Sequence, residues 1–415
     1  MRFDASFGRW RVDDKNASLS NRINEAQQHI VSIFLQQCTY GKQTKDLPSE
    51  FAACGQFVAG SAKDIPQRGL HGVAAALRVL GPCPSPECRA IVSRIVSYCE
   101  GCFGVNPALK LDPDFQVTDP DKKNVIKLGE LLYGLSFVTT AQAPARQLAE
   151  HIAGLLMHSQ IDGKGWGYFL GEQKVDLLPT AYAVRGLGHN GFDVAAPRKF
   201  LLDSLAAPRH SKISPADLTT IVACTYCLTF WRNQPDSTQD STLEKAFLDV
   251  WASLEPLMEE DIEQNLEYWG TTTYYVRIPW QLYLLALAAE YNQWRFAGFR
   301  SQRCLNRAIN AIRTDSFRYP YSGTQLSSRT NSIAYEVLTA IRERIRHQTW
   351  LSVANSIDSF RVFAGSRIVR RSAAVFAAVA IGWSAWQWLN QGHISDLAPH
   401  FISPLLLLLL ASGRR

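Results

Sequence analysis

The sequence predicts an all-α protein, an α/α toroid of about six helical hairpins that is followed by a C-terminal transmembrane hairpin. Two observations support this fold class. Apolar stretches rich in small residues recur six times through the middle of the chain, and none alternates as a half-buried strand does. An uncharged segment then begins at Ser372, and six consecutive leucines lie close to the end of the chain.

The six apolar stretches favour helices because each runs for ten residues or more without strand-like alternation. They are Leu70–Gly81, Lys127–Val138, Pro179–Gly188, Ala216–Leu228, Pro279–Tyr291 and Asn331–Arg344. Further helical patterns lie between them, such as 145–159 and 243–254, and residues 1–60 are expected to add an outer helix. An irregular period of about fifty residues indicates stacked helical hairpins, whose six inner helices close into a toroid. We therefore expect a toroid domain over residues 1–345 and a connecting helix over 346–371.

The C-terminal residues 372–415 have the composition of a membrane hairpin. Residues 372–389 carry no charge and nearly cross a hydrocarbon core of about 30 Å. Near the far end of this segment lie three indoles, which favour the membrane interface. They are Trp383, Trp386 and Trp388. The second segment, 397–412, is short and contains two prolines, so a tilted span and a re-entrant piece both remain open.

Charge placement predicts how this hairpin is oriented. Arg367, Arg370 and Arg371 precede the first segment, Arg414 and Arg415 follow the second, and the linker between them has neither Lys nor Arg. The positive-inside rule then places both ends in the cytosol, at the cytoplasmic (inner) membrane. No apolar signal-peptide region opens the chain, so we expect its bulk to stay cytosolic. The alternative is a soluble protein with a buried C-terminal helix pair.

The segment before the hairpin is strongly basic. Residues 295–371 contain fourteen Arg, no Lys and four acidic residues, a net charge of +10. Such a segment is attracted to anionic membrane lipid, at about 1 kcal/mol per charge near the surface. A solvated helix face is the alternative for Arg342, Arg344 and Arg346. No recognisable nucleic-acid motif is present, so nucleic acid is not expected as a partner.

One segment resembles a known family. Residues 162–188 read DGKGWGYFLGEQKVDLLPTAYAVRGLG, with a turn at Gly165-Trp166-Gly167 before a helix that opens with Thr180. This pattern resembles a repeat of the terpenoid cyclase and protein prenyltransferase superfamily, and 317–338 is a weaker echo of it. The resemblance implies an α/α toroid with a central cavity.

The chain lacks the chemistry of that superfamily. The acidic motifs DxDD and DDxxD are absent, and the Asp, Cys and His set of the prenyltransferase zinc site cannot be placed. Four cysteines, at positions 83, 88, 99 and 102, have the look of a zinc set. Cys88 and Cys99, however, lie about 16 Å apart along a predicted helix, too far for one zinc. We therefore expect no metal and no cofactor, although a smaller site with Cys99, Cys102 and a distant His stays open. His71 is interpreted as a structural residue.

Polar residues at the N-terminal ends of the inner helices are the predicted ligand site. In an α/α toroid these ends surround one mouth of the cavity, and Arg and Tyr beside helix N-termini suit an anion. The candidates are Asp176, Thr180, Asp217, Thr219, Tyr274, Tyr275, Arg277, Arg318, Tyr319, Tyr321, Arg329 and Asn331. The aromatic stripe YWGTTTYYVRIPW would offer a flat wall to a ring or a prenyl chain. In the alternative, the aromatics belong to the core and the arginines pair with Asp176, Asp217 or Glu336.

These features favour a membrane-anchored binding protein over an enzyme. Its expected partners are membrane lipid, an anionic or isoprenoid small molecule, and a protein partner or a second copy of the chain. Some bacterial membrane-acting effectors share the layout of a cytosolic domain joined to a short hairpin. The alternative is an enzyme that acts on an isoprenoid or other lipid. A carbohydrate-active enzyme would need an acid pair such as Asp176 and Asp217.

Overall fold

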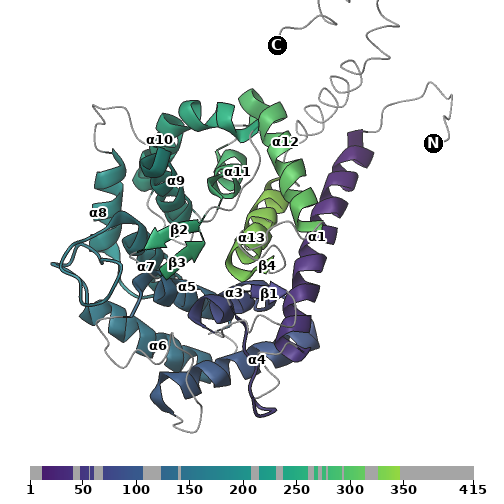
Figure 1. The fold of residues 1–415 in the computed structure, drawn as a ribbon. Coiled ribbons are helices and arrows are strands. Elements are labelled where there is room, and N and C mark those ends of the chain that lie inside the picture. The colour runs from purple at the N-terminus through teal and green to yellow at the C-terminus, as the bar shows by residue number, and fades with distance from the viewer. Residues whose placement is uncertain are drawn as a thin grey trace, which may run out of the picture. The chain divides into compact units, whose positions relative to one another are not determined.

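The computed structural model is mostly helical (Figure 1). It describes residues 12–40, 47–55, 57–59, 69–105, 123–138, 142–206, 215–229, 237–259, 266–269, 273–276, 279–291, 294–313 and 326–345. The chain divides into two compact units, one of residues 1–15 and 349–415 and the other of residues 16–348. No helix within the described ranges is both long and apolar enough for a membrane span. The predicted connecting helix and membrane hairpin, with Trp383, Trp386 and Trp388, lie outside these ranges.

Six helices follow one another in a closed circle of contacts (Figure 1). They are α3 (Leu70–Leu80), α5 (Val125–Ser136), α7 (Leu177–His189), α9 (Pro215–Thr229), α11 (Trp280–Glu290) and α13 (Ser328–Ile345). Each packs against the next, and α13 packs against α3. These inner helices confirm the six helical stretches predicted from the sequence, with ends that shift by a few residues.

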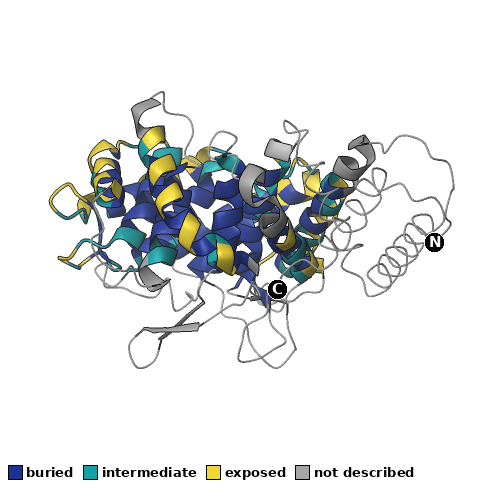
Figure 2. Ribbon diagram, turned by 90° about the horizontal axis from the view of Figure 1, so that it is seen from above, coloured by how far each residue is buried: buried dark blue, intermediate teal, exposed yellow. Residues whose placement is uncertain are grey.

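A second set of helices lies outside the first. They are α4 (Pro86–Glu100), α6 (Ala143–His158), α8 (Ala195–Ala206), α10 (Ser237–Leu254) and α12 (Trp294–Arg313). Each outer helix contacts the inner helix that precedes it, and α1 (Val12–Tyr40) hydrogen-bonds to α12 and α13. Two short helices follow α4 and α10, at Gly101–Val105 and Glu255–Glu259. Burial follows the arrangement: inner helices are buried all round, and outer helices show an exposed face (Figure 2).

Four short strands form two antiparallel pairs, which the sequence analysis did not predict. Strand β1 (Phe57–Ala59) pairs with β4 (Leu326–Ser327), and β2 (Leu266–Trp269) pairs with β3 (Thr273–Val276). The second pair overlaps the predicted aromatic stripe, whose Tyr, Trp, Thr and Val residues have high β-propensity. The alternation rule does not detect these strands, because neither LEYW nor TYYV alternates strictly between apolar and polar residues.

The Gly-Trp-Gly turn is fixed by packing against the start of α7. Trp166 is 1% exposed, and its Nε1–H donates to the carbonyl of Leu156 at 2.6 Å. The N–H of Trp166 donates to Thr180 Oγ1 at 3.0 Å, and a Cβ on Gly165 would lie only 2.5 Å from that oxygen. The turn therefore needs glycine, because any side chain at residue 165 would displace the Thr180 contact.

Helices α5 and α7 approach each other through glycines. A Cβ on Gly186 would lie 2.5 Å from the carbonyl oxygen of Gly129, and a Cβ on Gly129 would lie 2.6 Å from the carbonyl oxygen of Tyr182. The two backbones are thus in direct contact at this crossing. Glu130 directly follows Gly129, Arg185 directly precedes Gly186, and both of these charged side chains are buried.

Candidate functional site

Charged and tyrosine side chains meet in the buried interior between the inner helices. They form two groups, one around each of two glutamates. The Glu130 cluster comprises Glu130, His71, Arg329, Tyr182 and Tyr283. The Glu336 cluster comprises Glu336, Arg78, Arg185, Tyr133 and Tyr226. All six inner helices contribute at least one of these side chains.

The Glu130 cluster is a closed set of short contacts. Glu130 accepts a hydrogen bond from Arg329 Nε at 2.7 Å, and its other oxygen lies 2.7 Å from His71 Nδ1. The guanidinium of Arg329 also lies 5.5 Å from the centre of the Tyr182 ring. The hydroxyls of Tyr182 and Tyr283 are 2.8 Å apart. Every polar group named here has a partner, which suits a structural role in a buried core.

Electrostatics in the Glu130 cluster favour an ionised carboxylate beside a neutral imidazole. Burial opposes ionisation of Glu130, but the charges of Arg329 and Arg78 and the hydrogen bond with His71 outweigh it and hold its pKa well below the usual range. Burial lowers the pKa of His71, although Glu130 acts in the opposite direction. Because an ionised Glu130 only accepts hydrogen bonds, His71 carries its proton on Nδ1 and donates it.

The Glu336 cluster is more open. One oxygen of Glu336 accepts hydrogen bonds from Arg185 Nη2 and from the Tyr133 hydroxyl, the latter at 3.1 Å. The guanidinium of Arg185 lies 3.7 Å from the centre of the Tyr133 ring and 5.0 Å from that of Tyr226. Burial raises the pKa of Tyr226 to about 12, and it also raises the pKa of Tyr133. Both tyrosines therefore remain neutral at physiological pH.

Arg78 lies between the two clusters and is the least well paired of their cations. Its Nε lies 3.6 Å from Glu336 Oε2, and its Nη2 lies 4.0 Å from Glu130 Oε1. Its one hydrogen bond in the described part of the chain, from Nη1 to Ser332 Oγ, is long at 3.4 Å. Three arginines thus share two glutamates, and Arg78 has the longest distances.

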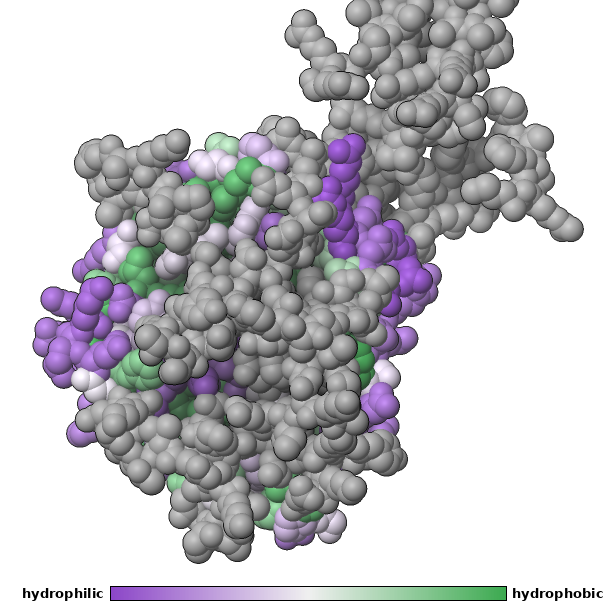
Figure 3. Space-filling view, in the orientation of Figure 1, coloured by the Kyte–Doolittle hydropathy of each residue, from purple (hydrophilic) through white to green (hydrophobic). Residues whose placement is uncertain are grey.

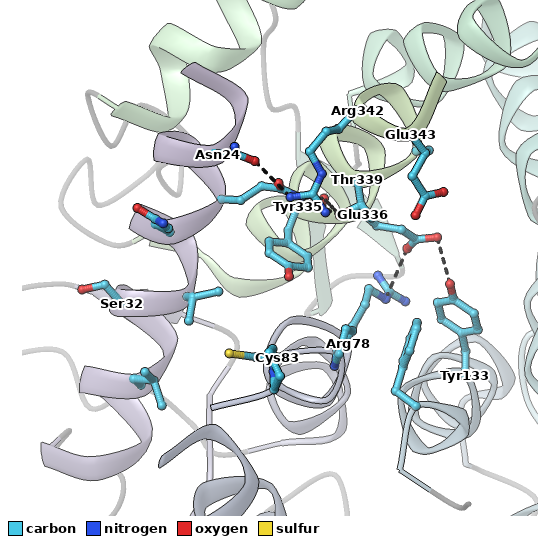
Figure 4. Close-up of a pocket in the computed structure, with 18 residues that line it drawn as sticks. Asn24, Ser32, Arg78, Cys83, Tyr133, Tyr335, Glu336, Thr339, Arg342 and Glu343 are labelled. Atoms are coloured by element: carbon cyan, nitrogen blue, oxygen red, sulfur yellow. Dashed lines mark hydrogen bonds and ion pairs between the residues drawn. The ribbon is translucent and has the colours of Figure 1, made fainter. Parts of the chain in front are cut away.

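A cavity of about 810 Å³ lies beside the Glu336 cluster (Figure 4). Its walls come from α1, from the loop after α3, from the end of α5 and from the second half of α13. Arg78, Tyr133 and Glu336 all line it, so the Glu336 cluster forms part of its surface. On the outside, hydrophilic residues gather along α1 (Figure 3). The volume lies within the range of about 300–1,000 Å³ that is typical of small-molecule sites.

Four buried polar atoms at this cavity have no hydrogen-bond partner among the described residues. They are Arg78 Nε, Glu336 Oε2, Gln27 Oε1 and Arg342 Nε. Two are donors and two are acceptors. The rest of the α1–α13 seam is bonded, with Gln27 Nε2 donating to Thr339 Oγ1 at 2.6 Å and Arg342 Nη1 to Asn24 Oδ1 at 3.0 Å. All four atoms are buried below the surface of the cavity, and Arg78 Nε and Glu336 Oε2 form an ion pair with each other at 3.6 Å.

Five of the predicted site residues have described side chains (Asp176, Thr180, Thr219, Arg329 and Asn331), and none of the five lines this cavity. Asp176 is the N-cap residue of α7, 29% exposed and 3.5 Å from Lys174 Nζ. Thr180 is buried in the Gly-Trp-Gly contact. Arg329 belongs to the Glu130 cluster, and it pairs with Glu130, an acid that the sequence analysis did not propose as its partner. Asn331 donates to the carbonyl of Ser327 at 2.8 Å.

The other predicted residues are described in part or lie outside the described ranges. Asp217 and Thr219 lie in the first turns of α9, and the side chain of Asp217 is not described. The backbones of Tyr274 and Tyr275 lie on β3, opposite Tyr268 and Glu267. The remaining four lie outside the described ranges, and their role stays a prediction. They are Arg277, Arg318, Tyr319 and Tyr321.

Most members of the two clusters were not singled out by the sequence analysis. The signal was present as polar residues three or seven positions apart inside apolar helices. His71 and Arg78 on α3 are seven apart, as are Arg329 and Glu336 on α13. Glu130 and Tyr133 on α5 are three apart, as are Tyr182 and Arg185 on α7. Such spacing places both residues of a pair on one helix face, here the face that looks inward.

No family model matches this chain, and no curated protein matches it in sequence. Over the described residues, no three His, Cys, Asp or Glu side chains come together as metal ligands do. Cys88, Cys99 and Cys102 are buried and belong to no disulfide, and Cys83 is partly exposed at the cavity.

Proposed function

We propose that this protein is a membrane-anchored α/α toroid that binds a small ligand between α1 and α13 and transmits binding to its C-terminal anchor. The closed circle of inner helices and the outer helix after each of the first five support the toroid. The packed Gly-Trp-Gly turn before α7 supports the likeness to the terpenoid cyclase and protein prenyltransferase superfamily. The uncharged residues 372–389 and the arginines that flank the hairpin support the anchor.

One observation carries the binding function: the cavity is walled by the two helices that lead out of the domain. Helix α1 crosses the boundary between the two units at residues 15 and 16. Helix α13 ends at Ile345, shortly before residue 349, where the chain returns to the unit of residues 1–15 and 349–415. Residues 346–371 then join α13 to the predicted anchor. A ligand held between α1 and α13 contacts the two helices through which we propose that binding is transmitted to the predicted anchor. Coupling requires that the ligand bind one arrangement of these helices more tightly than another.

The carboxylates of the two clusters favour binding over proton-driven isoprenoid chemistry. A general acid must hold a proton at working pH and lose it in the reaction. Glu130 is ionised, with its pKa held well below the usual range, and Glu336 is bonded to Arg185 and Tyr133. Neither carboxylate is set up as an acid. Their pairing instead gives the domain a rigid centre beside the cavity.

The anchor is tested by carbonate extraction of membranes from cells that express the full chain or a chain ending at residue 371. We expect the full chain to stay in the membrane pellet and the shortened chain to be soluble. Release of the full chain by carbonate would contradict the anchor.

The binding function is tested by mass spectrometry of small molecules that co-purify with the full-length protein. The cavity is blocked by Leu35→Trp, because Leu35 on α1 lines it. The control is Gln36→Trp, a neighbouring exposed residue outside the lining. We expect wild type and control to carry a small molecule that the Leu35→Trp protein lacks. Identical small molecules in all three proteins would refute binding at this cavity.

A further inference from the structure

We propose that Cys83 and Cys88 form a peroxide-reactive pair, in which a hydroperoxide oxidises Cys83 and Cys88 then closes a disulfide with it. Cys83 lies in the turn between α3 and α4, and Cys88 lies in the first turn of α4. This inference goes beyond the proposed function, since it assigns a modification site that requires neither the ligand nor the anchor.

Cys83 is the most accessible thiol of the protein. The structure describes all nine cysteines, none of them in a disulfide, and the eight others are buried. Cys83 is partly exposed and lines the cavity between α1 and α13 (Figure 4). Oxidation of thiols is site-selective because it follows exposure and thiolate character. A small oxidant in this cavity therefore meets Cys83 before any other thiol.

The turn holds the two thiols against each other. Cys83 lies between Pro82 and Pro84, which fix their own φ angles and restrict the backbone of Cys83. Ser85 is the N-cap residue of α4, and its Oγ accepts from the N–H of Cys88 at 3.1 Å. Cys83 Sγ lies 3.7 Å from the same oxygen, and the two thiols are hydrogen-bond partners. Cys88 is thus within reach of a modified Cys83 although it is buried.

The two thiols differ in acidity, which assigns their roles. Burial opposes ionisation of Cys83, but hydrogen bonds with the Cys88 thiol and with the N–H and hydroxyl of Ser85 outweigh burial and the charge of Glu87, and they lower the pKa of Cys83. Burial and the neighbouring Cys83 raise the pKa of Cys88 to about 11. Because the thiolate is the nucleophile, Cys83 attacks the peroxide, and Cys88 keeps its proton until the second step.

The reaction balances over two steps. The Cys83 thiolate attacks one oxygen of the hydroperoxide, the O–O bond breaks, and the other oxygen leaves and takes up a proton as an alcohol or water. Cys83 is then a sulfenic acid. The Cys88 sulfur attacks the Cys83 sulfur, the S–O bond breaks, and the hydroxide leaves as water with the Cys88 proton. Two thiols are thereby oxidised to one disulfide while the hydroperoxide is reduced.

Peptide mass spectrometry tests the pair against a matched control in the same molecule. One tryptic peptide, residues 79–89, contains this pair and no other cysteine. The tryptic peptide of residues 95–110 contains only Cys99 and Cys102, which are both buried. Reduced full-length protein in nonionic detergent is treated with stoichiometric hydrogen peroxide, blocked with N-ethylmaleimide and digested. We expect peptide 79–89 to lose two hydrogens at least about tenfold faster than peptide 95–110.

Two variants separate the roles of the two thiols. In Cys88→Ala protein, Cys83 should stop at the sulfenic acid, which dimedone traps as an adduct. In Cys83→Ala protein, the buried Cys88 should stay reduced. Equal oxidation of the two peptides in wild type, or oxidation of Cys88 without Cys83, would overturn the proposal. So would a sulfenic acid that accumulates on wild-type Cys83 without a disulfide. The comparison of the two wild-type peptides decides the matter even where a variant fails to fold.

Discussion

The Glu130 and Glu336 clusters use the same residue types on the same ring of helices, yet they differ in completeness. In the first, the carboxylate has short contacts to a cation and an imidazole at 2.7 Å each. In the second, one carboxylate oxygen faces Arg78 at 3.6 Å without a hydrogen bond and borders the cavity. Buried charge is thus closely paired in the Glu130 cluster and less closely paired in the Glu336 cluster, which lies beside the cavity.

The largest expected effect comes from removing either carboxylate. Glu130→Gln should lower the free energy of unfolding by about 3–5 kcal/mol, because it leaves Arg329 and Arg78 buried without their counter-charge. Glu336→Gln should cost less, about 1–3 kcal/mol, because the Glu336 side chain is 13% exposed, against 2% for Glu130, so water reaches the site of the lost charge more easily. Urea unfolding followed by circular dichroism measures both. Equal losses of unfolding free energy for the two variants would show that the Glu130 and Glu336 clusters are equally well paired.

The pH dependence of stability should come from the Glu130 cluster. Burial lowers the pKa of His71 in the folded state, so the unfolded chain binds more protons once the pH falls below the ordinary histidine pKa of about 6.5. The free energy of unfolding should therefore decline as the pH drops from that value toward the folded pKa. His71→Gln, which keeps a donor for Glu130, should show a flatter profile over the same window. Identical profiles for wild type and variant would mean that His71 titrates alike in both states.

The smallest effects should come from single tyrosine hydroxyls. Tyr182→Phe leaves the Tyr283 hydroxyl buried without this partner, whereas Tyr133→Phe leaves Glu336 with its bond from Arg185. We expect about 1–3 kcal/mol for Tyr182→Phe and about 0.5–1.5 kcal/mol for Tyr133→Phe. Thermal unfolding of the two variants under one condition measures the difference. A larger loss for Tyr133→Phe would reverse the order of the two clusters.

The helices could be predicted from the sequence because their signal is local. Apolar stretches such as Leu70–Gly81 and Pro279–Tyr291 have helical length and no alternation, and the structure begins α3 and α11 within one residue of these starts. Glycine, proline and the Gly-Trp-Gly turn separate the stretches. The strands of the β2–β3 pair were missed because neither LEYW nor TYYV alternates strictly between apolar and polar residues.

The clusters and the cavity could not be predicted because their partners are far apart in the chain. His71 meets Glu130 across 59 positions, and Arg329 meets Glu130 across 199. Gln27 meets Thr339 across 312 positions, which is what forms the α1–α13 wall. The sequence shows polar residues three or seven positions apart on α3, α5, α7 and α13, which places them on one face of each helix. It does not show which of these residues contact one another, because that depends on how the circle of helices closes.

That closure has a consequence for how the protein is made. Arg78 on α3 contacts Ser332 on α13, which follows it by 254 positions. The hairpins in between are local and can form during synthesis, whereas the last contact must wait for almost the whole domain. Until α13 leaves the ribosome, Arg78 and the first half of the ring remain exposed to water. The ring therefore closes only after residues 328–345 have been synthesised.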